Sequence, residues 1–172
     1  TKKANESMSH AYSHLWNLPI TMFRFFTVYG PWGRPDMALF KFVDAILSGE
    51  RIDVYNSGEM YRDFTYIDDL VVGIRRLIEV VPSLPNIPNR EAISGDSLSP
   101  VAAWRVVNIG NSDQVKLLDF IETIEASLGI TAQKNLMGMQ LGDVHATWAD
   151  SSLLKVLTGF QPSTPLIEGV GA

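Results

Sequence analysis

Two arginines in this sequence lie where a guanidinium could bind an anion. Arg34 belongs to a loop, residues 30–36, in which two glycines and two prolines restrict the backbone. Arg62 opens a segment, residues 62–67, that alternates like a strand. A guanidinium can donate two parallel hydrogen bonds to a carboxylate and several to phosphate oxygens. Because the formal net charge of the 172-residue chain is −5, an anion must be held by such local arginines rather than by an overall positive field.

Other kinds of chemistry find less support. The chain has no cysteine, which excludes disulfides, thiolate metal sites and cysteine nucleophiles and is consistent with a cytoplasmic location. His10 and His14 have a spacing that zinc sites use, but Ala11 stands where a metalloprotease glutamate would be, so we interpret them as surface histidines without a metal. No apolar run reaches a membrane-spanning length. We therefore expect neither a nucleic acid nor a membrane as partner.

Periodicity indicates alternating helices and strands, which is typical of the α/β class. Nearly every residue from Ile20 to Tyr29 is apolar, as in a parallel strand buried on both faces. Four prolines within residues 82–100 predict a flexible surface loop. The expected helices are residues 1–16, 39–47, 70–81, 117–128 and 152–157, and the expected strands are residues 20–29, 52–55, 62–67 and 106–109.

The sequence of residues 24–38, RFFTVYGPWGRPDMA, is similar to the strand-and-loop signature of UDP-glucuronate 4-epimerases. These are NAD-dependent nucleotide-sugar epimerases of the extended short-chain dehydrogenase/reductase family. The wider superfamily has Arg-x-x-Asn-x-Tyr-Gly-Pro here, and Thr27 replaces the asparagine. The resemblance implies that Thr27 contacts the sugar and that Arg34 faces its carboxylate. The alternative is that Arg34 only stiffens the loop.

Three further segments resemble the nucleotide-binding parts of the same family. Residues 61–69, YRDFTYIDD, match a segment whose arginine holds the diphosphate, which implies that role for Arg62; the alternative is that Arg62 and Asp63 only pair with neighbours at the surface. By the same resemblance Tyr55 stacks on uracil, although an aromatic residue of a sheet can also belong to the core. Residues 142–150, GDVHATWAD, match a segment that places Asp143 on the ribose hydroxyls.

This last region departs from the family pattern at two positions. Leu141 stands where a proline is usual, which leaves the local loop geometry open. Gln140 stands where related 4-epimerases of neutral sugars carry an arginine. Phosphate binding would therefore depend more on Arg62.

The opening residues, TKKANE, resemble the stretch that follows the catalytic tyrosine of the family. There a tyrosine lies four residues before a lysine on one helix face, and the ammonium favours the phenolate that removes a hydroxyl proton. Lys2 matches that lysine, with a further role at the nicotinamide ribose; a solvated helix end is the alternative. No Tyr-x-x-x-Lys and no glycine-rich dinucleotide motif occurs in the 172 residues. We therefore expect a C-terminal fragment, with NAD bound mostly by an N-terminal half.

The resemblance implies a remnant of a Rossmann-type parallel sheet together with a smaller substrate-binding domain. Residues 1–30 would end the Rossmann-type domain, and residues 31–165 would form mainly the nucleotide-sugar-binding domain with returns to the sheet. The parent would be a cytoplasmic homodimer of polysaccharide biosynthesis that inverts C4 of UDP-glucuronate, giving UDP-galacturonate, by transient oxidation with bound NAD. The alternatives are a UDP-glucuronate decarboxylase, a sugar-nucleotide 4,6-dehydratase, or a non-catalytic binding or oligomerisation fragment. We expect the isolated chain to be inactive.

Overall fold

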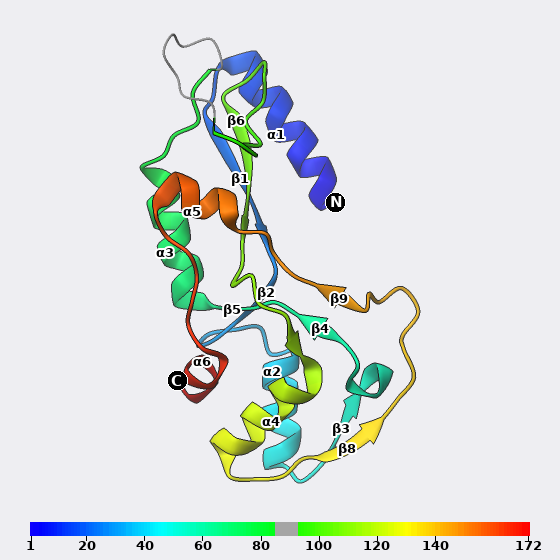
Figure 1. Cartoon of the computed structure of the whole chain (residues 1–172). Coiled ribbons are helices and arrows are strands. Elements are labelled where there is room, and N and C mark those ends of the chain that lie inside the picture. Colours follow the sequence, from blue (N-terminus) through cyan, green and yellow to red (C-terminus); the bar gives the residue numbers. More distant parts are fainter. Residues whose placement is uncertain (85–92) are drawn as a thin grey trace. The chain divides into compact units, whose positions relative to one another are not determined.

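The computed structural model describes residues 1–84 and 93–172, which form two compact units. Unit 1 consists of Thr1–Phe25, Val71–Ile109 and Asp150–Gln161. Unit 2 consists of Phe26–Leu70, Gly110–Ala149 and Pro162–Ala172. Helices and strands alternate along the chain (Figure 1), so the predicted α/β class is confirmed. No helix within the described ranges is long and apolar enough to cross a membrane.

Unit 1 is built on two parallel strands, β1 (Ile20–Phe25) and β6 (Trp104–Ile109), whose register places Ile20 opposite Trp104. Helix α1 (Lys2–Trp16) runs beside them and ends at Asn17, whose left-handed φ of 52° stops the helix as the sequence predicts. The other helices are α5 (Ser152–Thr158), which packs on β6, and α3 (Ile67–Ile78), which begins in unit 2 and continues in unit 1.

The long strand expected at residues 20–29 is divided at Phe26. Residues Thr27–Tyr29 form a separate strand, β2, which belongs to unit 2. Burial on both faces was also wrong, since Phe25 is 46% exposed. Among the described residues β1 pairs with β6 alone, so one edge of the strand has no neighbouring strand.

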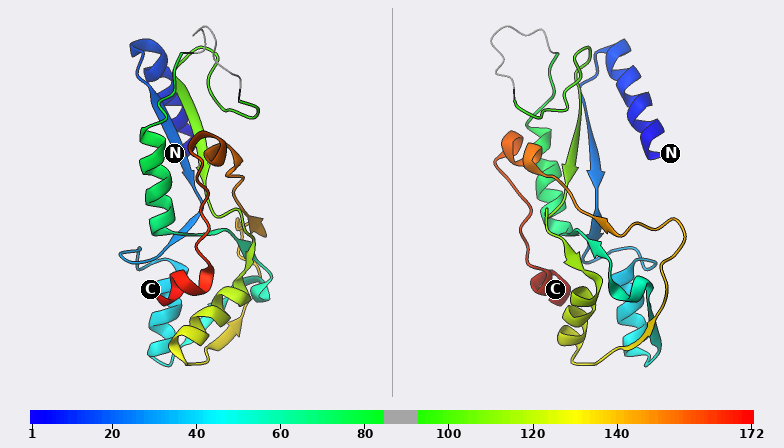
Figure 2. Two further views of the ribbon diagram at one scale, coloured as in Figure 1. Left: turned by 60° about the vertical axis from the view of Figure 1, so that its left-hand side comes forward. Right: turned by 45° about the vertical axis from the view of Figure 1, so that its right-hand side comes forward.

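Unit 2 has helices packed against several short strand pairs. The apolar faces of α2 and α4 enclose the core, where the rings of Phe64 and Phe120 stack with centroids 4.1 Å apart. In all three ribbon views α2 and α4 lie side by side (Figures 1 and 2). The helices are α2 (Ala38–Leu47), η1 (Tyr55–Gly58), α4 (Leu117–Leu128) and α6 (Leu166–Gly171). The remaining strands are β3 (Arg51–Val54), β4 (Tyr61–Arg62), β5 (Phe64–Tyr66), β7 (Val115–Lys116), β8 (Gln133–Leu136) and β9 (Ala146–Thr147).

The strands of unit 2 pair mostly in parallel. β2 pairs with β5 and β3 pairs with β8, both in parallel. β4 lies between an antiparallel β7 and a parallel β9. This three-stranded arrangement joins segments that are about eighty residues apart in sequence, because Arg62 is opposite Thr147.

The strand predicted at residues 62–67 is interrupted by Asp63, whose side chain is completely buried. One carboxylate oxygen accepts hydrogen bonds from the Asn111 N–H at 2.9 Å and the Thr65 hydroxyl at 3.2 Å. The other accepts from the N–H groups of Ser112 and Ala149, each at 2.9 Å. Asp63 therefore connects the segments after β6 and after β9 to the bend between β4 and β5. It does not pair with neighbours at the surface, which was the alternative that the sequence left open.

Glycine at position 110 is required by this cluster. A Cβ there would lie 2.8 Å from a carboxylate oxygen of Asp63 and would collide with the Ala149 methyl group. The backbone at Gly110 thus comes close enough to Asp63 for the next two N–H groups to reach its carboxylate.

Asp68 and Asp69 lie inside the first turn of α3 rather than before it, because the helix begins at Ile67 instead of Leu70. Asp69 accepts hydrogen bonds from the N–H groups of Ser163 at 2.9 Å and Thr164 at 2.8 Å. It therefore connects the start of α3 to the chain that leads into α6.

Part of the loop expected at residues 82–100 lies outside the described residues, namely 85–92. Hydrogen bonds hold the described part of this loop beside β6. The Asp96 carboxylate receives two hydrogen bonds of 2.9 Å from Arg105, and the Ser97 hydroxyl accepts one of 3.0 Å from the Val106 N–H. Residues 96–99 are thus connected to β6.

We predict that Asp63→Asn lowers the free energy of unfolding by about 2–3 kcal/mol, since an amide offers one oxygen where the carboxylate accepts from four donors. Urea titration of the protein measures this change. Asp68→Asn, which removes an exposed carboxylate five residues later, serves as the matched control. Equal losses for the two variants would contradict the role assigned to Asp63.

Candidate functional site

Unit 2 contains a cavity of about 560 Å³. One wall is a face of α2 that presents residues 38, 41, 42 and 45 at helical spacing, and strands β3, β4 and β5 supply much of the rest. Four of the residues predicted to bind substrate line this cavity: Thr27, Tyr55, Arg62 and Asp143. They come from four separate segments of the chain, so the fold of unit 2 brings them together.

Arg62 and Asp143 form one ion pair on the cavity wall. Nη2 of Arg62 donates to Oδ1 of Asp143 at 2.8 Å, and Nη1 donates to the Tyr61 carbonyl at 2.8 Å. The side chains are 19% and 33% exposed, respectively. Asp143 also accepts from the N–H of Val144 at 2.8 Å. The residues that the family resemblance assigns to phosphate and ribose are thus already fixed relative to each other, while Arg62 retains N–H groups for a further acceptor.

Tyr55 is held at the cavity by a tight turn. It follows β3 and opens η1, in which Asn56 and Ser57 have left-handed φ values of 49° and 50°. Gly58 comes next with φ 82°, and it lies so close to Leu118 that no side chain fits. The half-buried Tyr55 ring consequently lies on the cavity wall.

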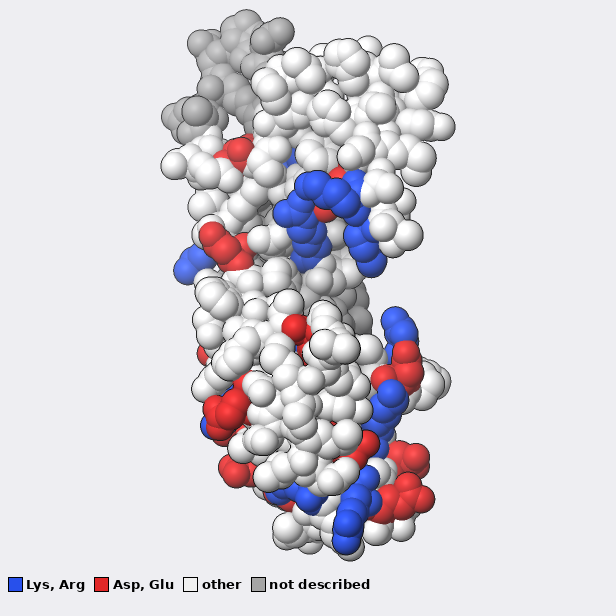
Figure 3. Space-filling view, turned by 90° about the vertical axis from the view of Figure 1, so that its right-hand side faces the viewer, with Lys and Arg blue, Asp and Glu red and all other residues white. Residues whose placement is uncertain are grey.

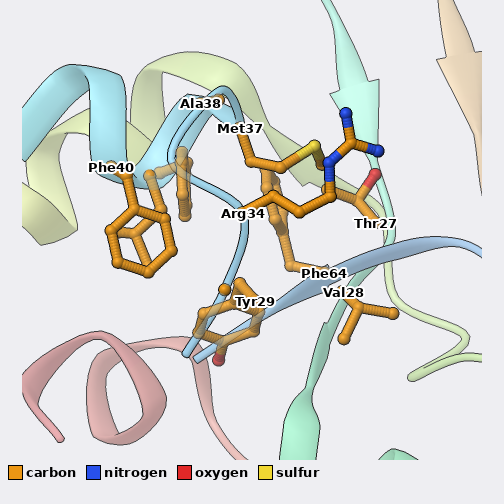
Figure 4. Close-up of a pocket in the computed structure, with 11 residues that line it drawn as sticks. Thr27, Val28, Tyr29, Arg34, Met37, Ala38, Phe40 and Phe64 are labelled. Atoms are coloured by element: carbon orange, nitrogen blue, oxygen red, sulfur yellow. The ribbon is translucent and has the colours of Figure 1, made fainter. Parts of the chain in front are cut away.

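Arg34 lies beside the cavity instead of in its lining. It lines a smaller hollow that shares Thr27, Met37 and Phe64 with the larger one, and its side chain extends toward Thr27 (Figure 4). Nε of Arg34 donates to Oδ1 of Asp36 at 3.0 Å, and Nη2 donates to Oδ2 of the same carboxylate. These hydrogen bonds raise the pKa of Arg34 and lower the pKa of Asp36 below its ordinary value, so both groups are ionised.

Lys2 belongs to unit 1 and is exposed in the first turn of α1. One turn further on, Glu6 accepts two hydrogen bonds from Arg24, at 2.7 and 2.8 Å, which connect α1 to β1. The hydrogen bond from Arg24 is the main reason that the pKa of Glu6 falls to about 2. This pair was not predicted from the sequence, because eighteen residues separate its members.

Lys41, Arg51 and Asp36 also line the cavity, and sequence reasoning missed all three. The helical spacing of Ala38, Lys41, Phe42 and Ala45 could have indicated that Lys41 shares a face with cavity residues. Basic and acidic side chains lie next to one another on the face shown in Figure 3, without a large patch of one sign.

His10 and His14 have partners other than a metal: His10 is 2.8 Å from the Ser99 hydroxyl and His14 is 2.9 Å from the Val101 carbonyl. No group of metal ligands occurs within residues 1–84 and 93–172.

The sequence pattern of the NAD dependent epimerase/dehydratase family matches residues 1–87, and the chain belongs to this family. It is 56% identical over 170 residues to a probable UDP-glucuronate 4-epimerase of Rhizobium meliloti (strain 1021), covering 99% of this chain and 50% of that protein. UDP-glucuronate 4-epimerase 4 of Arabidopsis thaliana is 41% identical over 174 residues, covering 99% of this chain and 38% of that protein. The chain thus spans about half the length, or less, of these curated relatives.

Among solved structures, UDP-glucuronic acid 4-epimerase from Bacillus cereus in complex with UDP-glucuronic acid and NAD has the same fold. Its TM-score is 0.79 at 31% sequence identity, over 98% of this chain and 48% of that one. The predicted resemblance to UDP-glucuronate 4-epimerases is thereby confirmed in sequence and in structure. The parallel pair β1–β6 fits the Rossmann-type sheet of this fold class.

Proposed function

We propose that the protein carrying this chain is an NAD-dependent epimerase that inverts C4 of UDP-glucuronate, and that unit 2 holds the nucleotide sugar. The observation that carries this proposal is the cavity that gathers Thr27, Tyr55, Arg62 and Asp143, with Arg34 beside it. A relative of the same fold was crystallised with UDP-glucuronic acid and NAD, which supports the same ligands here.

Each of these residues would contact a different part of the nucleotide sugar. The ring of Tyr55 offers a flat apolar face to uracil, and Asp143 can accept hydrogen bonds from ribose hydroxyls. Arg62 directs its remaining N–H groups at the diphosphate while its pairing with Asp143 keeps both side chains in place. Thr27 and Arg34 then orient the sugar. The Thr27 hydroxyl contacts the sugar ring, and the Arg34 guanidinium binds the C6 carboxylate.

Lys2 provides the link to the cofactor. Its exposed ammonium is a donor suited to a ribose hydroxyl, and on the same helix it would favour the phenolate of a tyrosine four residues earlier. Bound NAD would supply the reversible hydride acceptor that inversion at C4 requires. We propose that most NAD contacts come from another part of the protein, because these 172 residues contain no glycine-rich dinucleotide motif.

The proposal extends to the domains, assembly and setting. Unit 1 would belong to the Rossmann-type domain and unit 2 to the nucleotide-sugar domain. A homodimer is supported by the apolar side chains that α1 exposes, Met8, Tyr12, Leu15 and Trp16. A cytoplasmic location is supported by a sequence without cysteine. Nucleotide uronates are activated sugars, which is why we place the reaction in polysaccharide biosynthesis.

The reaction is tested by incubating the intact protein with UDP-glucuronate and following the sugar protons by NMR. We expect inversion at C4 with the carboxylate retained, and no turnover by the isolated 172-residue chain with added NAD, since it lacks a Tyr-x-x-x-Lys pair. A five-carbon sugar would identify a decarboxylase and a 6-deoxy-4-keto sugar a dehydratase, and either would overturn the epimerase proposal. Turnover by the isolated chain would refute its inactivity.

Arg34→Leu in the intact protein should lower kcat/KM for UDP-glucuronate and leave that for UDP-glucose nearly unchanged. We expect a loss of several-fold rather than of orders of magnitude, because the Arg34 side chain is 75% exposed and solvent screens its charge. Arg34→Lys should recover only part, since an ammonium lacks the planar fork. Arg75→Leu, an exposed arginine of α3, is the control. Equal losses for the two sugars would show that Arg34 serves the loop or the phosphates.

A further inference from the structure

Asp36 contacts Arg34 on one particular edge of the guanidinium. The two carboxylate oxygens accept from Nε and from Nη2, which together form the side edge of the group. A guanidinium has five N–H groups, and this arrangement uses two of them. Among the described residues no acceptor is bonded to Nη1 of Arg34, so the end edge, Nη1 with the second N–H of Nη2, remains available for a second carboxylate.

The backbone of the loop that carries both residues is fixed, but the Arg34 side chain is not fixed by packing. Gly33 lies against the ring of Phe40 with no room for a side chain, and the Met37 N–H donates to the Arg34 carbonyl at 3.1 Å. The side chain itself is 75% exposed, and the bonds to Asp36 are the contacts that set its direction. A long exposed side chain otherwise loses considerable rotamer freedom when it binds a ligand.

The negative charge of Asp36 is offset by two neighbouring cations, Arg34 and Lys41. It lines the large cavity, whereas Arg34 lines the smaller hollow next to Thr27. Hydrogen bonding to Arg34 and the nearby charge of Lys41 both hold the pKa of Asp36 below its ordinary value. The carboxylate therefore stays ionised throughout the neutral range, and the two cations offset its repulsion of an anionic ligand.

We infer that Asp36 is a positioning residue for Arg34: it clamps the side edge of the guanidinium and thereby presents the end edge to the carboxylate of a uronate sugar. This inference rests on the proposed function. It makes Asp36 a determinant of specificity, because a neutral hexose has no group that needs the oriented end edge. An Asp36 that competed with the substrate for Arg34 would instead weaken the binding of UDP-glucuronate.

The test uses the intact protein and isothermal titration calorimetry with two probes, UDP-glucuronate and UDP-glucose. Asp36→Asn should reduce the preference for UDP-glucuronate about five- to tenfold, while the Kd for UDP-glucose changes less than about twofold. Asp36→Glu, which keeps the charge, should restore part of the preference. Asp44→Asn removes an exposed carboxylate from the outer part of α2 and should leave both affinities unchanged. In an Arg34→Leu background, Asp36→Asn should have no further effect on the preference.

Several outcomes would overturn the inference. Tighter binding of UDP-glucuronate by Asp36→Asn would show that Asp36 competes with the substrate. Parallel changes for both sugars would show that it acts through general charge or loop stability. An NMR product assay on the same wild-type preparation distinguishes a failure of the positioning role from a failure of the proposed function. A wild type that epimerises UDP-glucuronate, with an Asp36→Asn variant that keeps its preference, refutes only the positioning role, whereas a wild type that does not bind UDP-glucuronate refutes the proposed function.

Discussion

The candidate site depends on one buried carboxylate. Asp63 accepts hydrogen bonds from Thr65, Asn111, Ser112 and Ala149, so that two distant segments meet at the bend between β4 and β5. A fully buried charge is tolerated only when such donors replace water. The preceding residue is Arg62, and its place on the cavity wall follows from this bend.

Arg34 and Arg62 share a common arrangement, in which each is paired with an acidic residue and still has N–H groups available. Arg62 is bonded to Asp143, and Arg34 is bonded to Asp36. Internal carboxylates orient the guanidinium groups, so the entropy of holding them is spent before a ligand arrives. In a chain with a net charge of −5, such oriented local cations are a more selective way to bind an anion than an overall positive field.

Long periodic elements could be predicted from the sequence, and short or tertiary features could not. The helix at Leu117–Leu128 was predicted with its observed ends, because apolar spacing and Gly129 mark it clearly. Strands β7 and β9 have two residues each, too few for any periodicity to appear.

The family motifs indicated Thr27, Tyr55, Arg62 and Asp143, which the fold gathers at one cavity. They gave no sign of the clamp by Asp36 or the cluster around Asp63, since those depend on contacts rather than on spacing. Leu141, which replaces the proline of the family, is fully exposed, so this substitution leaves no cavity and removes no packing contact.

A crystal structure of the intact protein with UDP-glucuronate bound tests the account most directly. The account predicts the nucleotide in the cavity of unit 2, with uracil against Tyr55 and the diphosphate on Arg62. It also predicts the C6 carboxylate on the end edge of Arg34, with Asp36 still bonded to the side edge. A nucleotide bound elsewhere, or a sugar carboxylate turned away from Arg34, would contradict it.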